Sequence, residues 1–502
     1  MTSRFDRSFL SFLARRAEMA HWGLSSPDVR RVITHDEAQA LGAYVRSVAN
    51  NPHLGIQIEH MVTAVATHRL GHSPRAIDMD TLSLSWPTQL GSGVRLDINT
   101  NVRDVPTLRR VIERALATQM PPVIRSSDDA DEDTDAGHAT EPPAPLPYLP
   151  VALWHERTVS AMTSERGTAL AQLHTPFQGS GWHGIGTVAF SERAFLYLSP
   201  AGDITAWGES TDSEVSMTAH TADGSAVGRS GQAHRDWGQL HLTRVAEMAI
   251  ADAERQRNPS RAEPGRYTAI LSPTAMGQLL RAMAPLFDLS SLSPLSPPNY
   301  RVGHKDKRGQ RLFDSHITLS TDPADPDGGD FPFFDGWGGL GYPSGKTTWV
   351  EHGVLRERSV DVGTGLQYGI VPRKDPFAIR MSGGPTSVAE MITQCERGIY
   401  VHEFADLDVI DRQSGAVSGY TRNGCLLISH GKIVRPIKNF RIFESPFASL
   451  NRVLALGMPE RVAFGFLPSG ARDRDVFWPL APVIAPPVMI RDFNFVALMD
   501  AT

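Results

Sequence analysis

Cysteine, lysine and long apolar runs are all scarce in this chain of 502 residues. Its two cysteines, Cys395 and Cys425, exclude a disulfide framework and a zinc site built from several thiolates. We therefore expect a reducing compartment and predict a cytoplasmic protein. No segment approaches the roughly 20 apolar residues that a membrane-spanning helix needs, so we expect no membrane partner. Lysine is absent from the first half of the chain, a bias that we attribute to genomic base composition.

The charge balance is mildly acidic, with 49 Lys and Arg against 55 Asp and Glu and a formal net charge of −6. An acidic surface repels nucleic acid and anionic membranes, so we expect neither as a partner. The hydrophobic fraction of 41% and the charged fraction of 21% are typical of a soluble globular protein. The length indicates two or three domains.

Alternating helical and strand-like patterns predict an α+β domain over residues 1–258. Residues 1–24 have apolar positions at helical spacing, interrupted by Arg and Glu, which indicates an amphipathic helix and not a signal peptide. The residue pattern from about 150 to 235 predicts strands, and the pattern that follows predicts an amphipathic helix within 237–258. We expect one side of that helix to be apolar, formed by Leu242, Val245, Ala246, Ala249 and Ala253.

Residues 125–147 are acidic, rich in Ser, Thr and Pro, and almost free of large apolar side chains. Such a segment cannot bury enough surface to offset its chain entropy, so we predict a flexible loop, with an acidic recruitment arm as the alternative.

The stretch PSRAEPG at 259–265 ends the first domain. Residues 265–502 are mostly short strands and turns, which predicts a β-rich second domain, barrel-like or a sandwich.

Two glycine-rich stretches resemble nucleotide-binding motifs by letter only. GSGWHG at 179–184 fits G-x-G-x-x-G, but TVAFSERAFLYL follows it and reads as a strand where a helix is needed. GYPSGKTT at 341–348 has the wrong glycine spacing for a phosphate loop, and again a strand pattern follows. We expect both to be turns, and no nucleotide cofactor.

The histidines do not form a recognisable metal or catalytic motif. His402 and Glu403 lack the second His that a helical zinc site needs one turn later. Cys425 and His430 are five residues apart and could approach on a hairpin, so an autonomous hydrolase built on Cys425, His430 and His402 stays an alternative. We expect His304, His316 and His352 to be surface or loop residues.

Ordered phrases between residues 263 and 495 resemble the TldD/PmbA family of peptidases. The two paralogous subunits of that family are TldD and TldE, the latter also called PmbA. A weaker match is HTPFQGSGWHG at 174–184. The main phrases are EPGRYTAILSPTAMGQLL (263–280), GQRLFDSHITLSTDP (309–323), FDGWGGLGYPSGKTTWVEHGVL (334–355), MSGGPTSVAEMITQCERGIYV (381–401), SGAVSGYTRNGCLLISHGKIVRPIKNFRI (414–442) and APPVMIRDFNF (485–495).

The resemblance implies that the zinc motif of the TldD subunit is missing from this chain. TldD carries H-E-x-x-x-H, in which two His bind Zn²⁺ and the Glu acts as general base. At the matching positions stand Arg281, Ala282 and Leu286. The family's third ligand, a Cys, would fall near 465–475, where this chain has none. Arg281 is a permanent cation and would repel a divalent metal ion.

The resemblance therefore implies a TldE/PmbA-like subunit without a cofactor of its own, paired with a zinc-bearing TldD-like subunit that cleaves extended peptides. It also suggests residues that face the cleft or substrate, namely Arg281 together with Asp335, Trp337 and Gly338. Trp337 stands where the family has Glu. A stand-alone peptide-binding scaffold remains the third alternative, beside the autonomous hydrolase.

Overall fold

The computed structural model describes residues 30–87, 95–100, 105–117, 147–202, 204–290, 292–335, 341–464 and 481–499. Four predictions lie outside these residues: the first helix, nearly all of the acidic loop, the third-ligand segment at 465–475, and the pair Trp337 and Gly338. None of the described helices is long and apolar enough to cross a membrane.

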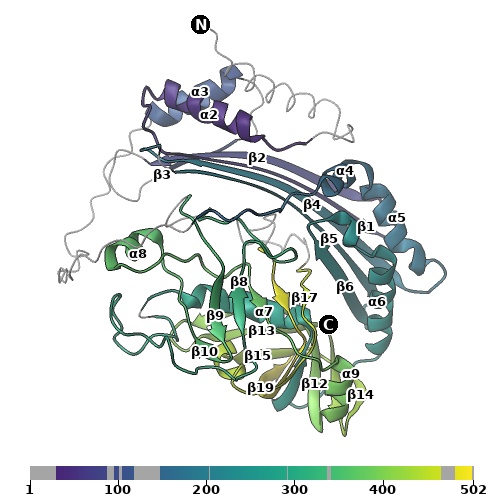
Figure 1. The fold of residues 1–502 in the computed structure, drawn as a ribbon. Helices are drawn as coiled ribbons and strands as arrows, with labels where there is room; N and C mark the ends of the chain where they lie inside the picture. The colour runs from purple at the N-terminus through teal and green to yellow at the C-terminus, as the bar shows by residue number, and fades with distance from the viewer. Residues whose placement is uncertain are drawn as a thin grey trace.

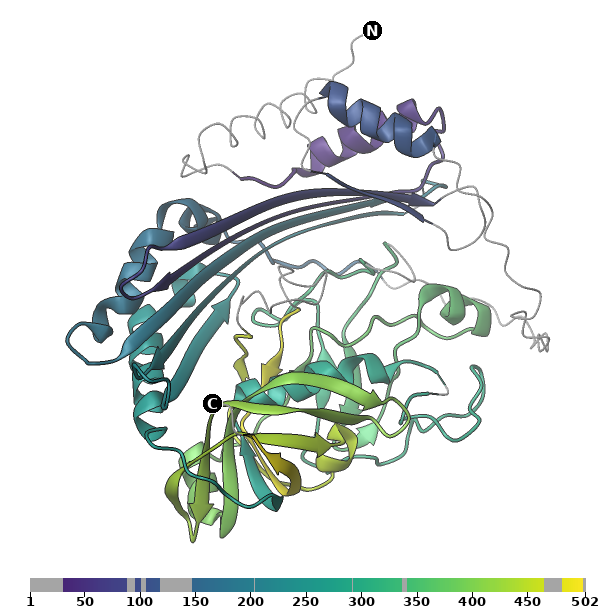
Figure 2. The same ribbon diagram turned by 180° about the vertical axis from the view of Figure 1, so that it is seen from behind.

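A long, curved antiparallel sheet dominates the described residues up to 258, which we call the sheet domain (Figures 1 and 2). Both views show helices on the outer side of the arch and the rest of the chain beneath its concave side. The strands, in spatial order, are β3 (Arg95–Thr100), β2 (Arg75–Pro87), β1 (Ile56–Arg69), β4 (His183–Leu198), β5 (Thr205–His220) and β6 (Val227–His234).

The helices of the sheet domain begin and pack for local reasons. At the start of α2, Thr34 and Glu37 form a capping box that satisfies free backbone N–H groups. On α6 the predicted apolar side is confirmed, because its five residues are buried against the sheet. The helices are α2 (His35–Val48), α3 (Val105–Ala117), α4 (Glu156–Ser164), α5 (Arg166–His174) and α6 (Leu242–Arg255), with short 3₁₀ turns η2 (Thr175–Phe177) and η3 (Trp237–Gln239).

The described residues from 265 to 499, which we call the barrel domain, contain a closed five-stranded barrel. The ring closes because β12 pairs with both β7 and β13, so the barrel-like alternative is confirmed over the sandwich. The ring runs β12 (Arg397–Asp411), β7 (Gly265–Leu271), β19 (Val488–Leu498), β15 (Phe440–Glu444) and β13 (Ala416–Ser429). Beside it, β14 (Lys432–Ile437) pairs with β13 and β16 (Val453–Leu456) with β19.

A second, smaller sheet of short strands lies beside the barrel. Its order is β10 (Val354–Leu355), β9 (Thr347–Glu351), β8 (Leu319–Thr321), β11 (Arg380–Met381), β18 (Ile484–Ala485) and β17 (Glu460–Arg461). The helical elements are α7 (Pro273–Met283), η4 (Ala284–Phe287), α8 (Val362–Tyr368), α9 (Val388–Gln394) and α10 (Pro446–Ser449). The α+β class predicted from the sequence is confirmed.

The helix α7 directly follows the barrel strand β7. Ser272 caps it by accepting a hydrogen bond from the backbone N–H of Ala275, and Pro273 occupies the first turn, where no donor is lost. One side of α7 is buried in the core of the barrel domain, through Met276, Leu279, Leu280 and Met283. Gln278 and Arg281 are on the side that this packing leaves open.

Candidate functional site

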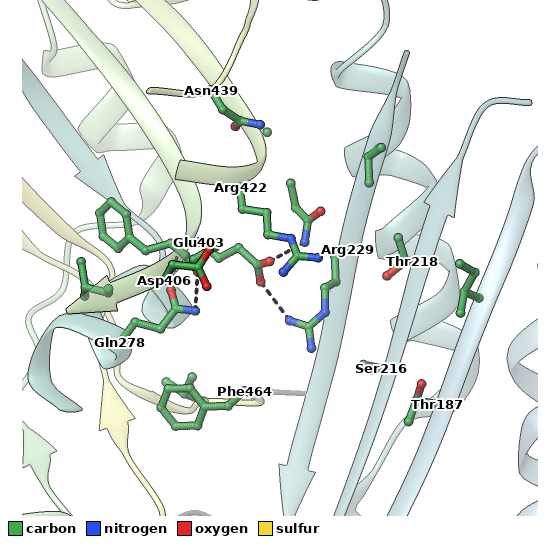
Figure 3. Close-up of a pocket in the computed structure, with 18 of the residues that line it drawn as sticks. Thr187, Ser216, Thr218, Arg229, Gln278, Glu403, Asp406, Arg422, Asn439 and Phe464 are labelled. Carbon is green, nitrogen blue, oxygen red and sulfur yellow. Dashed lines mark hydrogen bonds and ion pairs between the residues drawn. The ribbon is translucent and has the colours of Figure 1, made fainter. Parts of the chain in front are cut away.

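A cavity of about 1010 Å³ lies between the concave side of the sheet domain and the barrel domain. Its walls come from β4, β5 and β6 on one side, and from α7, β12 and β13 on the other (Figure 3). This volume is at the upper end of the range for small-ligand sites, so it suits a ligand as large as a short peptide.

The sheet wall of the cavity is polar because polar and apolar residues alternate along β5. Successive side chains of a strand point to opposite faces, so every second residue shares one environment. On β5 the residues Val215, Met217 and Ala219 are fully buried in the core of the sheet domain. The residues between them line the cavity: Asp212, Glu214, Ser216, Thr218 and His220.

The barrel wall is fixed to the sheet wall by a buried ion pair. Arg229 on β6 donates from Nη1 to Oε2 of Glu403 on β12, at 3.0 Å, and the Asn423 side chain donates to the other carboxylate oxygen of Glu403 (Figure 3). Only 8% and 6% of the two charged side chains are exposed. Removing either partner would leave a buried charge uncompensated, so the two walls hold each other in place.

Two further contacts order the cavity wall. The Gln278 amide on α7 pairs with the backbone of Phe404, donating to its carbonyl at 2.9 Å and accepting from its N–H at 2.6 Å. Arg461 donates to the Asp212 carboxylate. Two pairs of opposite charge on the walls, Arg229 with Glu403 and Arg461 with Asp212, thus neutralise each other.

Arg281 differs from these paired charges. Its Nη2 donates to the carbonyl of Ala481 at 2.7 Å, and its guanidinium lies 4.3 Å from the ring centroid of Phe464. Burial lowers the pKa of Arg281 to about 10, against an opposing effect of Glu214. The side chain therefore stays charged at neutral pH. Among the described residues, its Nε is buried without a hydrogen-bond acceptor.

The residues that match the zinc motif do not fit a zinc ion. Arg281 brings a positive charge to the cavity wall. Ala282 is partly buried and has no ligand atom, and Leu286 is enclosed in the hydrophobic core. Across the part of the chain that the structure describes, no three His, Cys, Asp or Glu side chains come together as a metal site. We therefore derive no metal chemistry from these residues.

Asp335 lies in a buried ion cluster and not among the cavity-lining residues. Its carboxylate pairs with Arg193 Nη1 at 2.9 Å and with Lys374 Nζ at 2.8 Å. Arg193 also contacts Glu59 at 2.7 Å, and Lys374 contacts Asp330 at 3.0 Å. These five residues, the interdomain ion cluster, join β1 and β4 to loops of the barrel domain. Burial alone would raise the pKa of Asp335, but Lys374 and Arg193 outweigh it and hold that pKa well below its usual value.

The structure does not assemble the Cys–His alternative. Cys425 is fully buried in the barrel core, and burial raises the pKa of its thiol to about 12. Its cross-strand partner Val401 is also in the core, so the next residue, His402, points to the opposite face of β12. His430 pairs with Glu396 in the turn after β13, roughly 15 Å along the chain from the thiol.

Both glycine-rich stretches lead into strands, as predicted. β4 begins at His183 within GSGWHG, and β9 begins at Thr347 within GYPSGKTT. Neither stretch is followed by a helix N-terminus that could hold a phosphate.

The sequence analysis missed most of the cavity wall. The alternation in DSEVSMTAH, residues 212–220, was a usable signal, since a polar residue at every second position indicates a strand with one polar face. The pair of Arg229 and Glu403 left no such signal, because its partners are separated by 174 residues.

Comparison with known proteins agrees with this architecture. Residues 264–497 match the family model described as the PmbA/TldA metallopeptidase C-terminal domain. No curated protein matches the chain.

Several solved structures share its fold. TldE from Thermococcus kodakarensis is 15% identical, with a TM-score of 0.67 over 91% of this chain and 99% of that one. A candidate modulator of DNA gyrase from Bacteroides thetaiotaomicron is 16% identical, with a TM-score of 0.66 over 92% and 100%. Another, from Thermotoga maritima, is 15% identical, with a TM-score of 0.65 over 91% and 99%. Residues 264–497 thus belong to the PmbA/TldA metallopeptidase family, and the chain as a whole has the fold seen in TldE.

Proposed function

We propose that this chain is the TldE/PmbA-like, metal-free subunit of a two-subunit zinc peptidase. The observation that carries the proposal is the state of α7 and η4, where Arg281, Ala282 and Leu286 replace all three groups of the zinc motif. Loss of one ligand would be compatible with a variant metal site. Loss of both ligands and the general base together favours a chain whose catalytic partner carries the zinc.

In this proposal the interdomain cavity contributes to the channel that receives an extended peptide. The edge strand β6 supports this role, since its residues Val227, Arg229 and Ala233 line the cavity. Among the described strands, only β5 pairs with β6, so its other edge offers backbone groups to a peptide strand. Backbone pairing of this kind depends little on peptide sequence, which suits a peptidase for unfolded or extended substrates. Such substrates include modified peptide precursors, and we place the complex in the cytoplasm.

The test is metal analysis of the purified chain, alone and after co-expression with a TldD-like chain that carries H-E-x-x-x-H. Cleavage of unstructured peptides is measured on both samples. We expect zinc and cleavage only in the co-expressed complex. Stoichiometric zinc or cleavage in this chain alone would contradict the proposal and favour an autonomous hydrolase. Failure to form any complex with such a chain would favour a stand-alone peptide-binding scaffold.

A further inference from the structure

Arg281 is a fixed cation on the cavity wall with donors left over. Its position is held from two sides, by the Ala481 carbonyl and by the Phe464 ring. These contacts use Nη2 and one face of the guanidinium. Within the described part of the chain, neither Nε nor Nη1 has an acceptor, although a guanidinium carries five N–H donors.

Two other cations of the cavity wall are each paired with a carboxylate. Arg229 is paired with Glu403, and Arg461 with Asp212. Glu214 acts on Arg281 through space, but among the described residues no carboxylate forms an ion pair with it. A buried charge without a partner is costly, so its retention indicates that a ligand completes it.

We propose that Arg281 is a carboxylate anchor, which binds one carboxylate of a peptide held in the interdomain cavity. A guanidinium matches the planar geometry of a carboxylate and forms short, charge-assisted hydrogen bonds with it. The peptide part of this inference rests on the proposed function. Arg281 therefore takes over a position that in a zinc subunit serves the metal, and uses it for binding.

The charge beside Arg281 favours a carboxylate over a more highly charged anion. Glu214 lines the same cavity and acts on Arg281 through space. It would repel a phosphate, with up to two negative charges, about twice as strongly as it repels a carboxylate. The carboxylate has two sources in a peptide: its C-terminus, or an Asp or Glu side chain.

The test measures binding of fluorescein-labelled peptides to the full chain by fluorescence anisotropy. Three short, unstructured peptides share one neutral sequence. The first has a free C-terminal carboxylate, the second a C-terminal amide, and the third a C-terminal amide with one internal Glu. The variants are Arg281→Gln, which removes the charge, and Arg281→Lys, which keeps it without the planar fork. Arg491→Gln is the matched control, since Arg491 is exposed on β19, outside the cavity lining.

We expect the wild-type chain to bind the free acid about 10-fold to 100-fold more tightly than the amide, the range for hydrogen bonds to charged groups. Arg281→Gln should abolish this preference, Arg281→Lys should keep part of it, and Arg491→Gln should keep all of it. Equally tight binding of the peptide with internal Glu would assign the anchor to acidic side chains. The inference is overturned by equal binding of all three peptides, by no binding of any, or by a preference that survives Arg281→Gln.

Thermal melting checks that each variant is folded. If Arg281→Gln does not fold, the wild-type preference and the Arg281→Lys variant still decide the question. The proposed function fails separately from the anchor. A co-expressed complex that cleaves peptides while the chain shows no carboxylate preference would refute the anchor alone. A clear preference in a chain that never supports cleavage would refute the proposed function alone.

Discussion

Within the interdomain ion cluster, loss of Lys374 should destabilise the protein more than loss of Asp335. The cluster contains three carboxylates, Glu59, Asp330 and Asp335, against two cations, Arg193 and Lys374. Its net charge is therefore one negative. Lys374→Met leaves Asp330 without its cation and raises the net charge to two negatives. Asp335→Asn instead leaves each cation with another carboxylate and brings the net charge to zero.

The expected magnitudes follow from burial. All five side chains are less than one third exposed, and breaking a buried pair by removing one partner costs about 3–5 kcal/mol. We expect Lys374→Met to lower the free energy of unfolding by about 4–5 kcal/mol. Asp335→Asn should cost about 2–3 kcal/mol, below that range, because each cation keeps a partner. As a control, Lys346→Met breaks a surface pair with Asp322 and should cost less than about 1 kcal/mol.

The assay is urea denaturation followed by tryptophan fluorescence, compared at neutral and acidic pH. The pKa of Asp335 is held below its usual value of 3.8, so its stabilisation is fully present above that pH and is lost as the pH falls below it. Asp335→Asn should therefore lose less stability on acidification than the wild-type chain. A larger cost for Asp335→Asn than for Lys374→Met would refute the charge argument, and a loss under about 1 kcal/mol for both would refute the cluster's role.

Two further predictions concern packing and thiol chemistry. A methyl group added at Gly228 would lie 2.1 Å from the backbone N of Ala253, so Gly228→Ala should lower the free energy of unfolding by at least about 2 kcal/mol. The control Gly167→Ala on α5 has open space around it and should raise the free energy of unfolding by up to about 1 kcal/mol. Thermal melts compare the two variants, and equal effects would contradict the close approach of β6 and α6. Cys395 and Cys425 are buried, and burial raises the pKa of each thiol. Neither should therefore react with a thiol reagent such as DTNB until denaturant is added. Fast labelling of the native chain would favour the Cys–His alternative instead.

Local patterns predicted the elements whose structure depends on their own residues. The helix α6 follows from its apolar spacing, and the β-rich character of the second domain follows from dense turn residues. The match between α7 and the zinc helix of the family came from sequence segments that occur in a fixed order. The strand before α7 and its cap at Ser272 also depend on local sequence.

Contacts between distant segments could not be predicted in this way. Asp335 was expected at the cleft because its neighbours resemble a family segment. Its surroundings are instead set by Arg193 and Lys374, which the chain topology brings to it from a sheet strand and from a separate loop. The pair of Arg229 and Glu403 likewise exists only once the two domains meet. Such positions depend on tertiary placement, for which a single sequence carries no periodic signal.

The place of β7 in the barrel has a consequence for synthesis of the protein. β7 ends at residue 271, but its two neighbours, β12 and β19, begin at residues 397 and 488. At about 5–20 residues per second, a ribosome needs roughly 10–40 s to pass from β7 to the start of β19. One edge of β7 waits unpaired until β12 is made, and the other edge waits until β19 is made. The barrel is thus a late-closing structure that folds slowly, and we expect the nascent chain to depend on chaperones until β19 emerges.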